Sequence, residues 1–143
     1  MQNKGKDAKK RGIFMDISKL DFIPFENALK SLEEGLNKPP QNDLERDGVI
    51  QRFEYCFELA WKMIRKSLLA LGRNEVSASP KPLFREALNE GWIENSKDWL
   101  AFTEARNSTS HLYNKKEAEK IYQVIKTFPA KAKFLLKKLQ ALQ

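Results

Sequence analysis

Residues 43–71 read DLERDGVIQRFEYCFELAWKMIRKSLLAL, and this stretch decides the fold. Apolar side chains recur in it every three or four residues, a spacing that predicts a long amphipathic helix ending at Gly72. A second apolar edge of Cys56, Leu59 and Met63 widens the apolar face. A helix with such a wide face is expected to be buried on two sides, as a central bundle member or a dimer contact is. The main stripe consists of Ile50, Phe53, Phe57, Ala60, Ile64, Leu68 and Leu71.

The sequence before and after this stretch predicts further helices and no strand. Apolar positions at near-helical spacing predict a helix over about residues 17–37, which Pro39 and Pro40 end. Ser79 followed by Pro80 has the pattern of an N-cap with proline in the first helical turn. A short helix is therefore expected to begin there and to close at Gly91.

The C-terminal third predicts two more helices. Ser96 is expected to cap a helix that contains Trp99 and Phe102. Residues 114–117 have the spacing of a capping box, which predicts a last helix from there to about Leu139, kinked at Pro129. The predicted fold class is therefore all-α, an up-and-down bundle of four main helices with an extra short helix.

Composition and length limit the possible functions. The chain has 143 residues, 41% of them hydrophobic, which suits one domain with its own core. Cys56 is the single cysteine and His111 the single histidine. These counts exclude an internal disulfide framework and metal sites built from several His or Cys ligands, so we expect no metal and no cofactor.

The net charge of +7 lies mainly at the two ends of the sequence. Residues 1–15 are predicted to form a flexible basic leader, which contacts phosphates non-specifically or is simply solvated, ahead of a helical domain over residues 16–143. Lysines on the last helix form a basic face that attracts RNA or an acidic partner, or is likewise only solvated. No stretch of 18 apolar residues and no secretory signal is present, so a cytoplasmic protein without membrane contact is expected.

Reactive side chains concentrate in one polar run, RNSTSHLY, from Arg106 to Tyr113. An arginine grips phosphate oxygens bidentately, and a histidine exchanges a proton near neutral pH. A histidine base and an arginine clamp suffice, in principle, for metal-independent cleavage of RNA through its 2′-hydroxyl. Asn107 can orient either the His111 imidazole or the phosphate. The alternative is that His111 has only a structural role near a helix end.

On a continuous helix, Asn107 and His111 would be neighbours four residues apart, with Arg106 and Tyr113 on an adjoining strip. Arg106 and His111 would then lie about 140° apart around the axis. One helix therefore does not present both side chains to one small atom without a long reach, and a two-fold dimer would bring a second set close by.

The motif Arg-x₄-His-x-Tyr, with asparagine after the arginine, resembles the signature of the HEPN superfamily (higher eukaryotes and prokaryotes nucleotide-binding domains). More closely, the chain resembles the nucleotidyltransferase substrate-binding protein family, which includes HepT-like toxin relatives. The similarity extends over roughly residues 17–140 and leaves out the basic leader. It rests on blocks at residues 52–62, 79–80, 85–87 and 99–114.

That resemblance implies a homodimeric helical bundle that acts with a minimal nucleotidyltransferase. In the toxin-like relatives, the residues matching Arg106 and His111 cleave RNA, and the residue matching Asn107 supports them. The resemblance further implies that the partner attaches AMP to Tyr113 and so silences the toxin. An adenylylated Tyr113 would place a bulky anion beside the Arg106 cation, whereas the alternative is a tyrosine that only packs at a helix end.

Two functional hypotheses follow. One is the toxin of a toxin–antitoxin pair, a metal-independent endoribonuclease with RNA as its substrate. The other is a non-catalytic subunit that holds the substrate of a two-component nucleotidyltransferase.

Several other residues have structural interpretations. Glu54 and Glu58, four residues apart, are expected to bond Lys62 or a partner chain rather than to act as a catalytic pair. Cys56 is expected to be a small core residue. Trp61, Trp92 and Trp99 are expected to pack in the core or an interface rather than to stack bases.

Overall fold

The computed structural model describes residues 16–143; the predicted basic leader, residues 1–15, lies outside the described residues. Within the described part, all regular structure is helical, which confirms the predicted fold class. The order of elements is η1 (Ile17–Lys19), α2 (Ile23–Leu36), α3 (Asp43–Ala70), α4 (Pro80–Asn89), α5 (Ser96–Asn107), η2 (Thr109–His111), α6 (Lys115–Ile125) and α7 (Phe128–Gln140).

The long helix α3 forms as its sequence predicts. The Asn42 side chain caps it by accepting a hydrogen bond from the Glu45 backbone N–H at 2.8 Å. Gly72 ends it with φ of +86°, a left-handed conformation that favours glycine. The predicted apolar stripe is buried except for its last residue, Leu71, which caps the helix and is exposed.

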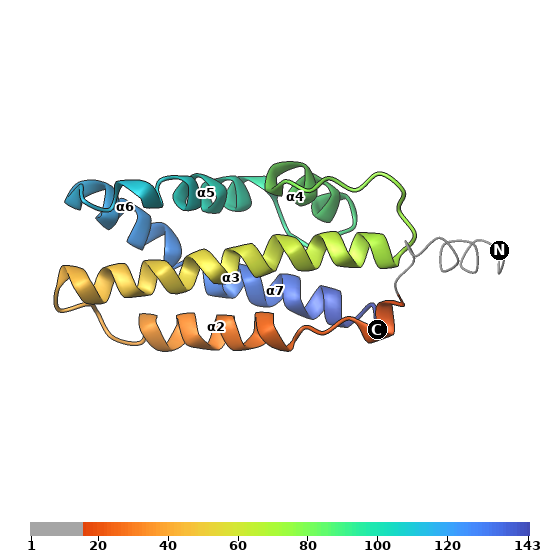
Figure 1. The fold of residues 1–143 in the computed structure, drawn as a ribbon, viewed down its shortest axis with the longest axis horizontal. Coiled ribbons are helices and arrows are strands. Elements are labelled where there is room, and N and C mark those ends of the chain that lie inside the picture. Colours follow the sequence, from red (N-terminus) through yellow and green to blue (C-terminus); the bar gives the residue numbers. More distant parts are fainter. Residues whose placement is uncertain (1–15) are drawn as a thin grey trace.

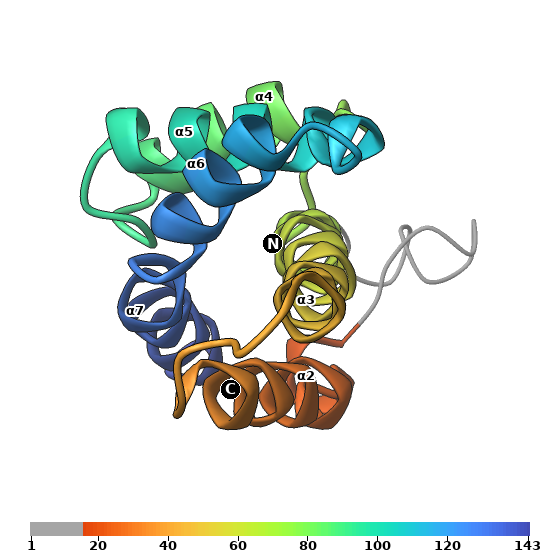
Figure 2. The same cartoon turned by 90° about the vertical axis from the view of Figure 1, so that its left-hand side faces the viewer.

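The helices form four sides around one core (Figures 1 and 2). Helices α2, α3 and α7 form three sides, and the short helices α4, α5 and α6 follow one another along the fourth, beside α3. Phe128, at the start of α7, joins three of these sides. Its ring centroid lies 5.1 Å from that of Phe53 in α3, and 5.6 and 5.0 Å from those of Trp99 and Phe102 in α5. This aromatic cluster fixes α5, and therefore the polar run at its end, against the core.

The first helix is shorter than predicted. A separate 3-10 turn, capped by Asp16, covers Ile17–Lys19, and α2 begins only at Ile23. Pro24 occupies the first turn of α2, where a missing N–H costs nothing. Inside one continuous helix over residues 17–37 it would remove a backbone hydrogen bond and clash with the carbonyl four residues earlier. The Asp21 carboxylate accepts a hydrogen bond from the Ile23 N–H at 2.9 Å and so satisfies a backbone donor at the start of α2.

The last predicted helix is two helices, because the expected kink at Pro129 is a break. Helix α6 ends at Ile125, and Pro129 lies in the first turn of α7, where proline fits well. The cap of α5 is also one residue earlier than predicted. Asn95 accepts the Asp98 N–H at 2.9 Å, and Ser96 is the first helical residue.

One lysine of the predicted basic face of the last helix, Lys133, is paired, and so is the neighbouring Lys131, whereas Lys126 and Lys137 form no ion pair with residues 16–143. Lys131 pairs with Glu94 at 3.4 Å and with Asp98 at 3.2 Å, and Lys133 pairs with Glu33 of α2. These contacts join α7 to neighbouring elements, so the charges of these two lysines are paired with carboxylates of the same chain. Within residues 16–143, no helix is long and apolar enough to cross a membrane.

The predicted core residues are largely confirmed. Cys56 is buried, and burial, with a smaller contribution from the Glu33 charge, raises the pKa of its thiol to about 12. Trp92 and Trp99 are buried as well, and Trp61 is half-buried. Cys56 therefore remains a neutral core residue at physiological pH.

Candidate functional site

The polar run from Arg106 to Tyr113 is not one helix. Helix α5 ends at Asn107, Ser108 caps it, and the chain tightens into the 3-10 turn η2. The expected helical neighbourhood of Asn107 and His111, and the strip shared by Arg106 and Tyr113, are therefore wrong. Ser, Thr and Asn bond nearby backbone groups in competition with the helix, and a run of them favours an end to it.

The following helix begins where the sequence predicts. The Asn114 side chain accepts the backbone N–H groups of Lys116 and Glu117 at 3.0 and 3.2 Å. The Asn114 N–H in turn donates to the His111 carbonyl oxygen at 3.0 Å. The segment between α5 and α6 is thus a short, hydrogen-bonded corner that holds His111 and Tyr113 near the C-terminal end of α5.

Arg106, in the last turn of α5, is directed at α3. One of its terminal nitrogens lies 3.3 Å from a Glu54 carboxylate oxygen, and its Nε lies 3.7 Å from Glu58. Glu54 and Glu58 are four residues apart, so both carboxylates project from one face of α3. The Arg106 side chain is 33% exposed, which leaves part of the guanidinium accessible to a ligand.

Thr109 completes this cluster. Its hydroxyl donates to Glu54 at 3.1 Å or to the Arg106 carbonyl oxygen at 2.9 Å, and it lies 3.2 Å from the Arg106 Nη1. Beside the cluster is an open cavity of about 280 Å³, lined by Gln51, Glu54, Tyr55, Glu58 and Arg106. The cavity is acidic on the α3 side and cationic on the α5 side.

The contact between Arg106 and the two glutamates replaces the Lys62 partner that the sequence predicted for Glu54 and Glu58. The Arg106 Nε is buried and has no hydrogen-bond acceptor within the described chain, because Glu58 lies beyond hydrogen-bonding distance. The signal available in the sequence was charge: two carboxylates one turn apart on a helix repel each other, and a nearby cation relieves that repulsion.

His111 and Tyr113 are brought together. The His111 Nδ1 lies 3.4 Å from the Tyr113 hydroxyl, and the two rings meet edge to face with centroids 5.9 Å apart. Both side chains are exposed, Tyr113 to 78%. Within residues 16–143, the His111 ring forms no hydrogen bond to a helix-end carbonyl, the contact expected for its structural alternative. Asn107 is also exposed, on the last turn of α5.

Three of the four predicted site residues therefore divide into two groups at one corner of the bundle, and within residues 16–143 the Asn107 side chain hydrogen-bonds to neither group. Arg106 is held by Glu54, Glu58 and Thr109, while His111 and Tyr113 contact each other in solvent. The chemistry present consists of one anchored cation, one imidazole and one phenol. In residues 16–143, no group of three or more His, Cys, Asp or Glu side chains is placed to hold a metal ion.

An all-helical bundle with an Arg, a His and a Tyr at one interhelical corner defines a class of small helical proteins. The chain belongs to the family described as nucleotidyltransferase substrate binding protein like, whose model matches residues 20–141. The family resemblance predicted from the sequence is thereby confirmed.

One relative is the Haemophilus influenzae protein named probable ribonuclease HepT, 36% identical over 96 residues. The aligned region is 65% of this chain and 66% of that protein, just under two thirds of its length. Two solved structures have the same fold. One is HI0074 of Haemophilus influenzae, described as the fold of a substrate binding domain of a nucleotidyltransferase, with a TM-score of 0.76 and 30% identity over 84% of this chain and 99% of that one. The other, from Thermus thermophilus, has a TM-score of 0.74 and 31% identity over 80% and 98% of the two chains.

Proposed function

We propose that this protein is a metal-independent endoribonuclease, the toxin of a pair whose other member is a minimal nucleotidyltransferase. The observation that carries the proposal is the corner where an anchored arginine and an exposed His–Tyr pair follow one another in the chain. The 36% identity to a protein named as a probable ribonuclease supports it.

In this proposal Arg106 binds the scissile phosphate and His111 exchanges the proton. The His111 imidazole removes the proton of the RNA 2′-hydroxyl, and the 2′-oxygen bonds to phosphorus. The bond from phosphorus to the 5′-oxygen breaks, and that oxygen takes a proton from water. Arg106 stabilises the charge on the phosphate oxygens, and the exposed Asn107 orients the phosphate. The products carry a 2′,3′-cyclic phosphate and a 5′-hydroxyl.

The proposed control is adenylylation of Tyr113. The Tyr113 oxygen attacks the α-phosphorus of ATP in the partner enzyme, pyrophosphate leaves, and AMP remains on the phenol. The 78% exposure of Tyr113 supports this, because a partner must reach the hydroxyl. Its 3.4 Å distance from the His111 imidazole means that AMP there would cover the proposed base. We further propose that the protein is a cytoplasmic homodimer, with a second copy adding its own site residues.

A second candidate function is a non-catalytic subunit that binds the substrate of the nucleotidyltransferase. The observation in its favour is that Glu54 and Glu58 already partner the Arg106 charge, which lowers its attraction for a polyanion. The description of HI0074 as a substrate binding domain also favours it.

Expression in a bacterial host separates the two candidates. The toxin proposal expects growth arrest by the wild-type chain and normal growth with His111→Ala, since His111 is exposed and its loss leaves the fold intact. Co-expression of the nucleotidyltransferase should relieve the arrest and add the mass of AMP to wild type but not to Tyr113→Phe. Normal growth with well-expressed, folded wild type would contradict the toxin and favour the binding subunit.

A further inference from the structure

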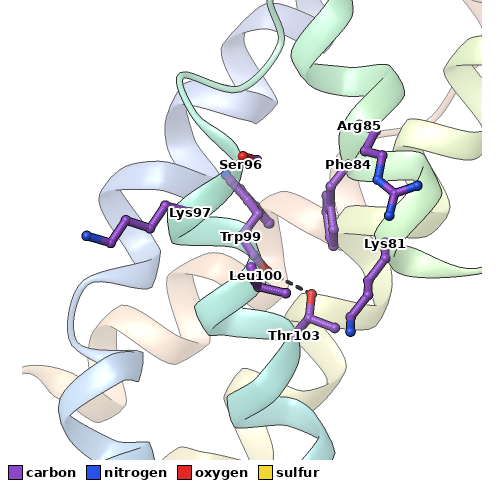
Figure 3. A pocket seen from close by; sticks show the side chains of 8 residues that line it. All are labelled: Lys81, Phe84, Arg85, Ser96, Lys97, Trp99, Leu100 and Thr103. Carbon is purple, nitrogen blue, oxygen red and sulfur yellow. Dashed lines mark hydrogen bonds between the residues drawn. The ribbon is translucent and has the colours of Figure 1, made fainter.

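A pocket of about 380 Å³ lies between α4 and α5, on the α5 surface ahead of the Arg106 corner (Figure 3). Its floor is apolar. The Phe84 and Trp99 rings pack with centroids 4.8 Å apart, and Leu100 beside them is 45% exposed. The pocket is lined by Lys81, Phe84, Arg85, Ser96, Lys97, Trp99, Leu100 and Thr103, a set with three cations and no carboxylate.

Two of the cations are placed to act together. Lys81 and Arg85 are four residues apart on α4, and both project on the same side of the pocket, whereas Lys97 extends away from them. Both are exposed, and neither forms a hydrogen bond or ion pair with any residue from 16 to 143.

Three acids close to the pocket residues in the sequence are already engaged elsewhere. Glu86 and Glu90 pair with Arg73. Asp98, next to Lys97, receives a hydrogen bond from Asn95 at 3.0 Å and pairs with Lys131. The pocket therefore keeps its positive charge uncompensated, and like charges one turn apart on α4 slightly disfavour the helix. A bound anion would remove that repulsion.

We propose that this pocket binds a phosphate monoester carried on an aromatic ring system. A monoester has a charge of about −1.5 to −2 at pH 7, which matches the two cations Lys81 and Arg85. The Arg85 guanidinium suits two phosphate oxygens, and the Lys81 ammonium suits the third. The ring then covers the apolar floor and buries the exposed part of Leu100.

The floor also selects the kind of ring. The Thr103 hydroxyl donates to the Trp99 carbonyl oxygen at 2.7 Å, which leaves Ser96 as the remaining side-chain hydroxyl of the lining able to donate to a ring edge. A nucleobase has several polar edge groups, and these would lose hydrogen bonds to water on such a floor. The pocket should therefore prefer a ring with few polar edges, and its volume falls in the range of ligand pockets.

Calorimetric titration of the full chain tests this proposal with four probes: 1-naphthyl phosphate, 1-naphthol, inorganic phosphate and AMP. Naphthyl phosphate should bind at least tenfold more tightly than naphthol or phosphate, because only it engages both the cations and the floor. It should also bind more tightly than AMP. No saturable binding of naphthyl phosphate, or tighter binding of AMP, would overturn the proposal.

Variants place the ligand in the pocket. Lys81→Gln and Arg85→Gln should each weaken naphthyl phosphate about tenfold, and Leu100→Ser should weaken it severalfold. Lys137→Gln is the matched control, since it removes one exposed lysine of α7 far along the chain. Backbone amide shifts should occur in residues 81–85 and 96–103. Equal affinity in all four variants, or shifts confined to residues 106–113, would overturn the assignment; a failure of the proposed ribonuclease activity leaves these outcomes unchanged.

Discussion

The cations near the two ends of α5 differ in whether they have acidic partners. At the C-terminal end, Arg106 is held between Glu54 and Glu58 of α3 and supported by Thr109. Along the N-terminal half, the pocket shared with α4 has Lys81 and Arg85 without an acidic partner among residues 16–143. Both regions adjoin helix α5, whose Trp99 and Phe102 rings pack against Phe128 in the aromatic core.

The two arrangements differ in how firmly each cation is positioned. A guanidinium held by two carboxylates has a fixed place but a reduced net attraction for anions, which suits a group that must meet one phosphate in one geometry. Unpaired cations attract anions more strongly but lose side-chain entropy when a ligand orders them. Under the two proposals, the C-terminal end of α5 would serve chemistry and the pocket along its N-terminal half would serve binding.

Among variants that leave Arg106 and His111 in place, the largest expected effect comes from removing the charges that hold Arg106. In the double variant Glu54→Gln, Glu58→Gln, the guanidinium loses its anchor while two negative charges leave the cavity. We expect kcat for RNA cleavage to fall about tenfold, because the arginine is no longer positioned, while KM falls because repulsion of the RNA phosphates is reduced. Steady-state cleavage of a fluorogenic RNA measures both constants.

A matched control for this double variant is Glu33→Gln, which removes a carboxylate from α2 that pairs with Lys133. It should leave both constants unchanged. If the double variant raised kcat, the glutamates would be inhibitory. That result would contradict the positioning role proposed for them at the C-terminal end of α5.

A smaller effect is expected on stability. Arg106→Gln leaves Glu54 and Glu58 one turn apart without a cation and should cost about 1 kcal/mol, since exposed ion pairs contribute up to that amount and like charges then repel. Lys81→Gln and Arg85→Gln should cost nothing or stabilise slightly, because those cations have no partner to lose. Urea unfolding at pH 7 gives the three values, and a loss for Lys81→Gln as large as for Arg106→Gln would contradict the account.

The smallest expected effect concerns Asp98, in the first turn of α5. A hydrogen bond from the Asn95 side chain, helped by Lys131, lowers the pKa of the Asp98 carboxyl below its usual 3.8. A lowered pKa stabilises the fold above the unfolded value, and that stability is lost as the pH falls through the folded value. Asp98→Asn should therefore be less stable by roughly 0.5 kcal/mol at pH 7, discounted for exposure, with the gap closing below pH 4. A gap that persists at pH 2.5 would show that the carboxylate charge is not the cause.

The fold was largely predictable because burial imposes a period on the sequence. The stripe from Ile50 to Leu68 predicted α3, and Gly72 predicted its end. The errors arose at prolines. Pro24 and Pro129 both lie in first helical turns, yet the helical pattern continues before each of them, so the sequence did not reveal where one helix stops and the next begins.

The site was predictable in its residues but not in its geometry. The Arg106 to Tyr113 run was visible because its side chains are chemically distinctive. Its placement depends on Ser108 and Thr109, which end α5 through local hydrogen bonds that helical spacing does not encode. The α4–α5 pocket was not visible either, because its lining comes from two segments whose facing sides are fixed only by packing.

RNA cleavage by the purified protein in EDTA tests the central claim most directly. Wild type, Arg106→Ala and His111→Ala are incubated with mixed RNA, and the fragment ends are identified by mass spectrometry. The proposed mechanism predicts cleavage by wild type only, with 2′,3′-cyclic phosphate ends and at least a hundredfold loss in each variant. Intact RNA with all three folded proteins, or equal cleavage by all three, would contradict it.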